Sequence, residues 1–162
     1  MPAKKTIAIV GATEKEGAKL ACLFAGTGYR LLLVSNNGTA LTQLLDNIIL
    51  NGPTAEIDTI ECVKDGCWEA DIIILTVSAD DENEVAQMMK EVATQKIVVS
   101  ISGKKSEVLR QVLPYSKLVK ISSVLSKEIF ISGEDEEAND EIAQIFLHAG
   151  CHPVLANGIS IK

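Results

Sequence analysis

The sequence predicts an α/β fold in which a mostly parallel sheet carries helices on both faces. Short aliphatic runs alternate with longer amphipathic stretches along most of the 162 residues. This βα order is typical of a parallel sheet whose crossover helices cover both faces. Aromatic residues make up only 4% of the chain, so Val, Ile and Leu must fill the core, as they do in buried parallel strands. We expect a single domain over residues 1–162.

The expected strands are apolar runs bounded by glycine, proline or polar residues. The clearest is Asp71–Val77, where four aliphatic residues in a row imply that both faces of the strand are covered. The other expected strands are Thr6–Val10, Arg30–Val34, Glu56–Cys62, Lys96–Ile101, Leu118–Ser122, Ile129–Ser132 and Cys151–Leu155.

The expected helices have apolar residues three and four positions apart. On the first of them, Ala18, Ala21 and Cys22 share an apolar face, which places the Cys22 thiol in the core. The last begins with four acidic residues, which favour the positive end of a helix dipole. The expected helices are Lys15–Ala25, Ala40–Leu50, Glu82–Ala93, Ser106–Leu113 and Glu134–His148.

The charge and the cysteine content argue against several classes of function. The net charge is −7 and no basic patch occurs, which argues against binding to nucleic acid or to an anionic membrane surface. No apolar run is long enough for a signal peptide or a membrane span. The four cysteines form no C-x-x-C pair, so we expect reduced thiols and a cytoplasmic protein. His148, Cys151 and His152 lie close together, but their spacing matches no common zinc site, so we expect no metal.

The first strand is followed by the turn Gly11-Ala12-Thr13-Glu14-Lys15-Glu16-Gly17. In a dinucleotide-binding fold this turn reads G-x-G-x-x-G. The best register here puts Ala12, Glu14 and Gly17 at the three glycine positions, so only the third is glycine. Glu14 brings a carboxylate to a helix start that would otherwise attract phosphate, and Lys15 is the one cation nearby.

A second interpretation of this turn needs no ligand. Thr13 and Glu16 have the spacing of a capping box, in which the Thr13 hydroxyl accepts from the Glu16 amide and the Glu16 side chain reaches back. The helix would then be capped by its own side chains.

The end of the second strand normally selects the cofactor. An Asp or Glu there binds the ribose hydroxyls of NAD, and an Arg suits the 2′-phosphate of NADP. The sequence instead has Ser35, Asn36 and Asn37. These side chains can donate hydrogen bonds to a phosphate, so we expect NADP rather than NAD. The alternative is that Asn36, Asn37 and Gly38 only form a turn.

Four segments carry a resemblance to a known family. Thr6–Asn36, with Gly11-Ala12-Thr13 and Gly17, resembles the start of the NADP oxidoreductases that depend on coenzyme F-420, a deazaflavin. Ala70–Val77, Lys96–Ser100 and Ile131–Glu137 are similar to the same family. Pyrroline-carboxylate reductases and β-hydroxyacid dehydrogenases share this pattern. The resemblance implies a Rossmann-like domain that binds NADP and passes hydride between it and the deazaflavin or a small substrate.

The resemblance also implies where the cofactor would lie. Ala12, Thr13 and Gly17 fall on the diphosphate loop, and Ser35 and Asn36 at the adenosine 2′-phosphate. Thr76, Val77 and Ser78 fall on the nicotinamide side, with Ser100 and Ile101 nearby. Gly11, Lys15, Glu16 and Asn37 complete the expected cofactor-binding residues. No catalytic side chain is expected from the sequence, because hydride transfer is chemistry of the cofactor.

Three departures from the family leave a second function open. Glu14 replaces a glycine, Asn36 and Asn37 replace basic residues, and the 162 residues lack the C-terminal segment that helps relatives enclose substrate or dimerise. The alternative is a non-catalytic regulatory or interaction protein that has lost dinucleotide binding. A homodimer is expected only by resemblance. The atypical short-chain reductases share Gly-Ala-Thr, but Tyr29 and Tyr115 lack the Lys four residues on that their catalytic pair requires.

Overall fold

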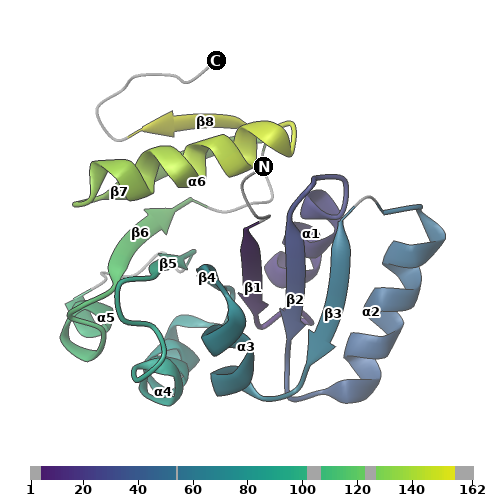
Figure 1. Cartoon of the computed structure of the whole chain (residues 1–162), viewed down its shortest axis with the longest axis horizontal. Helices are drawn as coiled ribbons and strands as arrows, with labels where there is room; N and C mark the ends of the chain where they lie inside the picture. Colours follow the sequence, from purple (N-terminus) through teal and green to yellow (C-terminus); the bar gives the residue numbers. More distant parts are fainter. Residues whose placement is uncertain (1–4, 54, 102–106, 123–126, 156–162) are drawn as a thin grey trace.

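The computed structural model describes residues 5–53, 55–101, 107–122 and 127–155. Within these ranges eight strands form one sheet in the order β3-β2-β1-β4-β5-β6-β7-β8, seen in Figure 1. Strands β1 to β6 run parallel, β7 pairs antiparallel with β6, and β8 is parallel to β7. The strands are β1 Thr6–Val10, β2 Arg30–Val34, β3 Glu56–Ile60, β4 Ile72–Leu75, β5 Ile97–Ser100, β6 Lys117–Ile121, β7 Glu128–Gly133 and β8 His152–Leu155.

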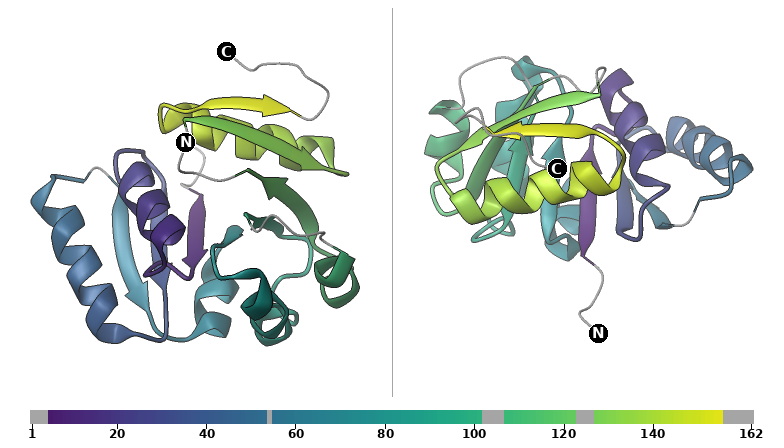
Figure 2. Two further views of the ribbon diagram at one scale, coloured as in Figure 1. Left: turned by 180° about the vertical axis from the view of Figure 1, so that it is seen from behind. Right: turned by 90° about the horizontal axis from the view of Figure 1, so that it is seen from above.

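Helices cover both faces of this sheet, as Figures 1 and 2 show from three directions. One face packs against α1, α2 and α6, and the other against α3, α4 and α5. Helix α6 joins β7 to β8 and lies along both strands. The helices are α1 Lys15–Phe24, α2 Gly38–Leu50, α3 Val63–Glu69, α4 Ala79–Met89, α5 Glu107–Val112 and α6 Glu136–His148. The expected α/β class with a mostly parallel sheet and helices on both faces is therefore confirmed.

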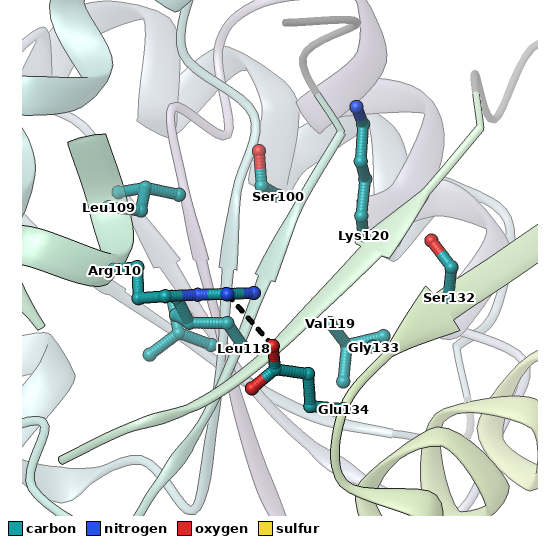
Figure 3. A pocket seen from close by; sticks show the side chains of 10 residues that line it. Ser100, Leu109, Arg110, Leu118, Val119, Lys120, Ser132, Gly133 and Glu134 are labelled. Carbon is teal, nitrogen blue, oxygen red and sulfur yellow. Dashed lines mark ion pairs between the residues drawn. The ribbon is translucent and has the colours of Figure 1, made fainter. Parts of the chain in front are cut away.

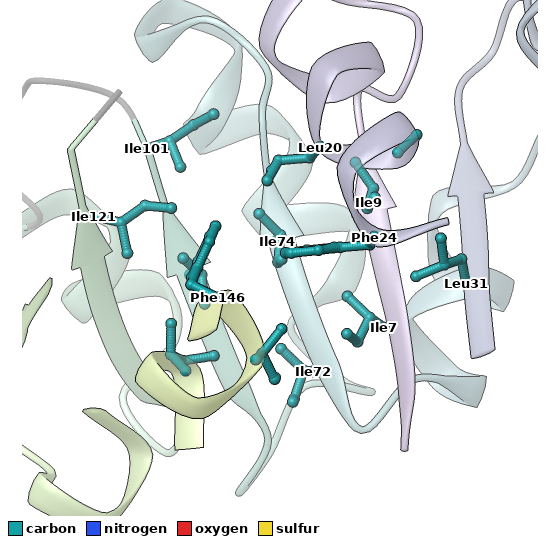
Figure 4. Close-up of a cluster of buried hydrophobic side chains, with 14 of the residues drawn as sticks. Ile7, Ile9, Leu20, Phe24, Leu31, Ile72, Ile74, Ile101, Ile121 and Phe146 are labelled. Atoms are coloured by element: carbon teal, nitrogen blue, oxygen red, sulfur yellow. The ribbon is translucent and has the colours of Figure 1, made fainter. Parts of the chain in front are cut away.

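The two hydrophobic cores follow from the strand pattern. Alternate residues of each buried strand point to opposite faces, so Ile7 and Ile9 enter one core while Ala8 and Val10 enter the other. In the first core the rings of Phe24 and Phe146 meet with centroids 5.3 Å apart (Figure 4). This contact packs α1 against α6, two helices that are far apart in the sequence.

Most expected elements agree with the structure to within a few residues, but two expectations are wrong. Cys22 is exposed, because α1 buries Gly17, Leu20, Ala21 and Phe24 instead. Helix α3 was not expected from the sequence, and its seven residues include the poor helix former Gly66. Smaller differences occur at α4, which begins three residues earlier than expected, and at β3, which ends at Ile60. Among the described helices, none has the length and apolarity to cross a bilayer.

Candidate functional site

A cleft of about 390 Å³ opens beyond the carboxyl ends of β1, β2, β3 and β4. Its position is the point where the strand order reverses between β1 and β4, which is where open α/β sheets bind their ligands. Each of the four strands is followed by residues of the cleft, and α4 forms one wall. The lining residues are Val10, Gly11, Thr13, Glu14, Val34, Ser35, Asn36, Glu61, Val63, Val77, Asp81, Glu84, Val85 and Met88.

Two glycines shape the loop between β1 and α1. Gly11 has φ +88°, a conformation that side chains with a Cβ rarely adopt, and a Cβ there would lie 2.8 Å from Thr76 Oγ1. Gly17 lies where α1 crosses the loop, and a Cβ there would collide with the Gly11 carbonyl oxygen and Thr76 Oγ1. Gly17 thus allows the close approach of helix and strand that the third glycine of the dinucleotide motif provides.

Thr76 holds the loop between β1 and α1 in place from inside the protein. Its side chain is buried, and its hydroxyl donates to the carbonyl oxygens of Val10 and Gly11, both at 2.8 Å. Ala12 is also buried, and its amide donates to Val34 O. Both residues, which the sequence analysis placed at the cofactor, therefore support the loop from inside the protein. Val77 lines the cleft beside them.

The expected capping box is wrong. The N-cap of α1 is Glu14, and its side chain makes no capping hydrogen bond. The Thr13 hydroxyl is instead 2.9 Å from Ser35 Oγ, which links the loop to the end of β2. The start of α1 is therefore not closed by the side chains that the ligand-free interpretation required. Lys15 and Glu16 lie in the first turn of α1, with Lys15 exposed.

The polar residues after β2 are largely occupied within the protein. Ser35 Oγ accepts from the Asn37 amide at 3.2 Å in addition to its contact with Thr13. Asn37 is the N-cap of α2, and its Oδ1 accepts from the Ala40 amide. Asn36 is exposed and lines the cleft. The turn interpretation of this segment thus has direct support, whereas its role as a phosphate site stays a prediction.

The cleft is acidic. Glu14, Glu61, Asp81 and Glu84 all line it, and none of its described lining residues is Lys, Arg or His. Only Glu14 stood out in the sequence analysis. Glu61 was assigned to the third strand, and Asp81 lies just before the expected helix Glu82–Ala93. The signal for Glu61 was available, because adjacent parallel strands end at the same edge of a sheet. For Asp81 and Glu84 the missing information was the earlier start of α4.

The remaining expected residues do not themselves line this cleft. Ser78 is exposed at the start of α4, where its hydroxyl donates to Asp81 Oδ2. Ile101 is buried in the core that α1, α2 and α6 cover. Ser100 is buried at the end of β5, and its hydroxyl donates to Glu82 Oε2 at 2.7 Å. None of these three is among the residues that line the acidic cleft.

A second cavity, of about 260 Å³, lies between α5 and the ends of β5, β6 and β7 (Figure 3). Ser100, Lys120 and Ser132 lie in one row across these strands, because they are register partners. At the rim, Arg110 and Glu134 form an ion pair of 2.8 Å. This cavity contains the cations that the cleft lacks, but Arg110 is already paired. Among the described residues no group of His, Cys, Asp and Glu could hold a metal ion.

Comparison with known proteins bears on the fold. No protein-family model and no curated protein sequence matches this chain. The structure of Plasmodium falciparum pyrroline carboxylate reductase with NADP bound is similar with a TM-score of 0.73 and 15% identity, covering 95% of this chain and 58% of that one. A pyrroline-5-carboxylate reductase from Coxiella burnetii gives 0.74 and 15%, covering 96% and 59%.

A protein assigned as an F420-dependent NADP reductase from Arthrobacter sp. FB24 is similar at the same level. Its TM-score is 0.73 with 16% identity, covering 94% of this chain and 84% of that one. The chain thus spans less than two thirds of the two pyrroline carboxylate reductases and most of this protein. Taken with the strand order and the position of the cleft, these likenesses show that the chain has an α/β fold of the Rossmann type.

Proposed function

We propose that the chain is a nicotinamide dinucleotide-binding domain that serves an oxidoreductase. The observation that carries this proposal is the Gly11–Gly17 loop at the reversal of strand order. Gly11 makes a turn that needs positive φ, and Gly17 lets α1 pack directly on the loop. This construction is the one that brings a backbone and a helix start to a diphosphate.

The shape of the cleft and of the loop beside it suits a nicotinamide dinucleotide. The cleft is open, the loop approaches it closely, and the N-cap of α1 leaves the helix start without a capping side chain. A bound nicotinamide would supply hydride chemistry. The chain's own residues would bind and orient it: the loop after β1 at the diphosphate, the residues after β2 and β3 at the adenosine, and Val77 toward the nicotinamide. Solved structures of the same fold include reductases, which supports this proposal.

The acceptor of the hydride is proposed from the resemblance alone. A deazaflavin or a small imine or carbonyl compound would lie beyond the end of β4. The second cavity, at the ends of the strands β5, β6 and β7, offers Lys120 as a polar group on that side of the sheet. NADP is the cofactor that the sequence analysis expected, and the residues after β2 are the basis of that expectation.

The decisive test is a titration of the purified protein with NADH and with NADPH, followed by calorimetry and by thermal shift. We expect saturable binding of at least one of the two. Absence of binding by both at millimolar concentration contradicts the proposal.

Glu14 is the main electrostatic obstacle, so Glu14→Gly should strengthen binding. A carboxylate at a helix start opposes a diphosphate there by about 0.3–1 kcal/mol, and the glycine also makes room. We expect about a two- to fivefold lower Kd. Glu14→Gln is the matched variant, because it removes the charge but keeps the bulk. Unchanged affinity in both variants would show that the diphosphate does not lie at this loop.

The second candidate function is a non-catalytic regulatory or interaction domain. It is favoured by one observation, the four carboxylates in a cleft whose described lining holds no cation. In that case the natural chain binds neither dinucleotide, and Glu14→Gly creates affinity where none existed.

A further inference from the structure

Glu61 lies at the corner of the cleft where this fold places the adenosine ribose. Strands β2 and β3 are in register up to Val34 and Ile60, and the Ser35 amide still donates to Ile60 O at 3.3 Å. Glu61 therefore leaves the sheet directly beside Ser35. Both residues line the same cleft as Gly11. The carboxylate from β3 thus reaches the region that the residue after β2 normally serves.

The Glu61 carboxylate lies against Gly38, the first residue of α2. A Cβ added to Gly38 would be 2.7 Å from Glu61 Oε1 and 3.3 Å from Oε2, so both oxygens lie against the backbone of Gly38. The position is favourable for a negative charge, because it is the positive end of a helix of 13 residues. A Cβ at position 38 would displace this carboxylate, so the glycine there leaves room for it where it lies.

The residues after β2 are poorly placed to serve a 2′-phosphate. Ser35 Oγ already has two partners, Thr13 and Asn37, and Asn37 Oδ1 caps α2. The described lining of the cleft contains no cation that could neutralise a phosphate. Two vicinal hydroxyl groups, by contrast, are donors, and a carboxylate with two oxygens is the acceptor that suits them.

We propose that Glu61 binds the adenosine ribose, and that it makes the site selective for NAD(H) over NADP(H). Its oxygens accept hydrogen bonds from the 2′- and 3′-hydroxyls. A 2′-phosphate removes one of these donors and places like charges together. This inference rests on the proposed function and names the cofactor that the cleft prefers. It differs from the expectation drawn from Ser35, Asn36 and Asn37, which is the competing outcome of the test.

The test is calorimetric titration of the wild-type chain and three variants with NADH and with NADPH. We expect the wild type to bind NADH about tenfold or more tightly than NADPH, since charge-assisted hydrogen bonds contribute on this scale. Glu61→Gln should lose about tenfold in NADH affinity and bind NADPH more tightly than the wild type does, because the like charge beside the 2′-phosphate is gone. Glu61→Arg should reverse the preference. The control is Asp46→Asn. It removes an exposed carboxylate of α2, the helix whose first residue Glu61 contacts, at a position outside the cleft.

Each outcome has a separate meaning. If the wild type binds neither dinucleotide, the proposed function fails and the role of Glu61 fails with it. If it binds NADH and Glu61→Gln behaves like Asp46→Asn, only the role of Glu61 is overturned, as it is by a wild-type preference for NADPH. A role of Glu61 confined to stabilising α2 would lower the melting temperature of Glu61→Gln without changing the ratio of the two affinities, and that result also overturns the inference.

Discussion

Gly17 shows how one missing Cβ sets the geometry of the site. The atoms that a Cβ would meet are the carbonyl oxygen of Gly11 and the hydroxyl of Thr76, which is itself held by two carbonyl groups. Neither neighbour can move without disturbing the end of β1. The close packing of α1 on the loop is therefore a property of the backbone, and it persists although the other two glycines of the dinucleotide motif are absent.

The same contact predicts a large difference between two glycine-to-alanine variants. Gly17→Ala should lower the free energy of unfolding by about 1–3 kcal/mol, because overpacking against backbone forces α1 outward. Gly28→Ala is the matched control, since no heavy atom lies within 4 Å of the added Cβ. Its change should stay within about 0.5 kcal/mol. Urea unfolding measures both, and equal stability of the two variants would refute the packing argument.

Burial separates the four cysteines by reactivity. Burial raises the pKa of the Cys67 thiol to about 12 and also raises the pKa of Cys151, whereas Cys22 and Cys62 are exposed. Because the thiolate is the nucleophile, iodoacetamide at pH 8 should label Cys22 and Cys62 and spare the other two until the chain unfolds. Peptide mass spectrometry with and without urea gives the pattern. Rapid labelling of Cys67 in the native protein would contradict its placement in the core.

The raised pKa of Cys67 also predicts a dependence of stability on pH. The native state keeps the thiol proton in a range where the unfolded chain, with a pKa near 9.0, loses it. The contribution to stability is therefore complete below pH 9 and is lost as the pH rises towards 12. Relative to Cys67→Ala, the wild type should lose up to about 1.4 kcal/mol per pH unit in this window. Parallel curves for the two proteins would show that the thiol does not titrate there.

Between elements, the hydrogen bond from Ser100 to Glu82 joins α4 to the end of β5. Both side chains are buried, and the distance is 2.7 Å. Hydrogen bonds to charged groups contribute about 1.5–3 kcal/mol, so Ser100→Ala should destabilise the fold by that amount. A double-mutant cycle with Glu82→Gln isolates the pair, and we expect a coupling energy above about 0.5 kcal/mol in urea unfolding. A coupling energy of zero would mean that the two groups act independently.

The elements that could be predicted from sequence are those whose pattern is local. The run Asp71–Val77 indicated a strand covered on both faces, and all four residues of β4 within it are buried. Helix α3 could not be predicted, because its stability comes from other elements. Lys96, the residue before β5, donates to the carbonyl oxygens of Cys67 and Trp68 near the end of α3, both at 2.7 Å. A contact with a residue so far along the chain cannot be inferred from the seven residues of α3 alone.

The site was predictable in its location but only partly in its chemistry. Gly11, Thr13, Ser35, Asn36 and Val77 were expected at the cofactor and line the cleft. Other expected residues, such as Thr76, have side chains that point into the protein. The hydrogen-bond partner of Thr76, Val10 O, lies on the neighbouring strand β1. Asp81 and Glu84, which also line the cleft, were missed because α4 starts earlier than expected.

At the scale of the whole molecule, the cleft and the chain carry charge of one sign. The net charge is −7, and four carboxylates line the place where a dinucleotide would enter. A dinucleotide is itself an anion, so the long-range field of the protein opposes its approach. The binding energy must therefore come from short-range contacts, namely the loop backbone, the apolar wall of Val63, Val85 and Met88, and hydrogen bonds to the ribose.

This balance predicts the opposite salt dependence from that of most anion-binding proteins. Raising the ionic strength from about 0.01 M to 0.15 M shortens the screening length from about 30 Å to about 8 Å, which weakens repulsion between the exposed carboxylates and the incoming cofactor. The affinity for NADH should therefore rise with salt in the wild type, and the rise should be smaller in Glu14→Gln, where one repulsive charge is gone. Calorimetry at matched KCl concentrations measures both slopes. An affinity that falls with salt would require a cationic contact, and Lys15, exposed in the first turn of α1, would then be the residue to mutate first.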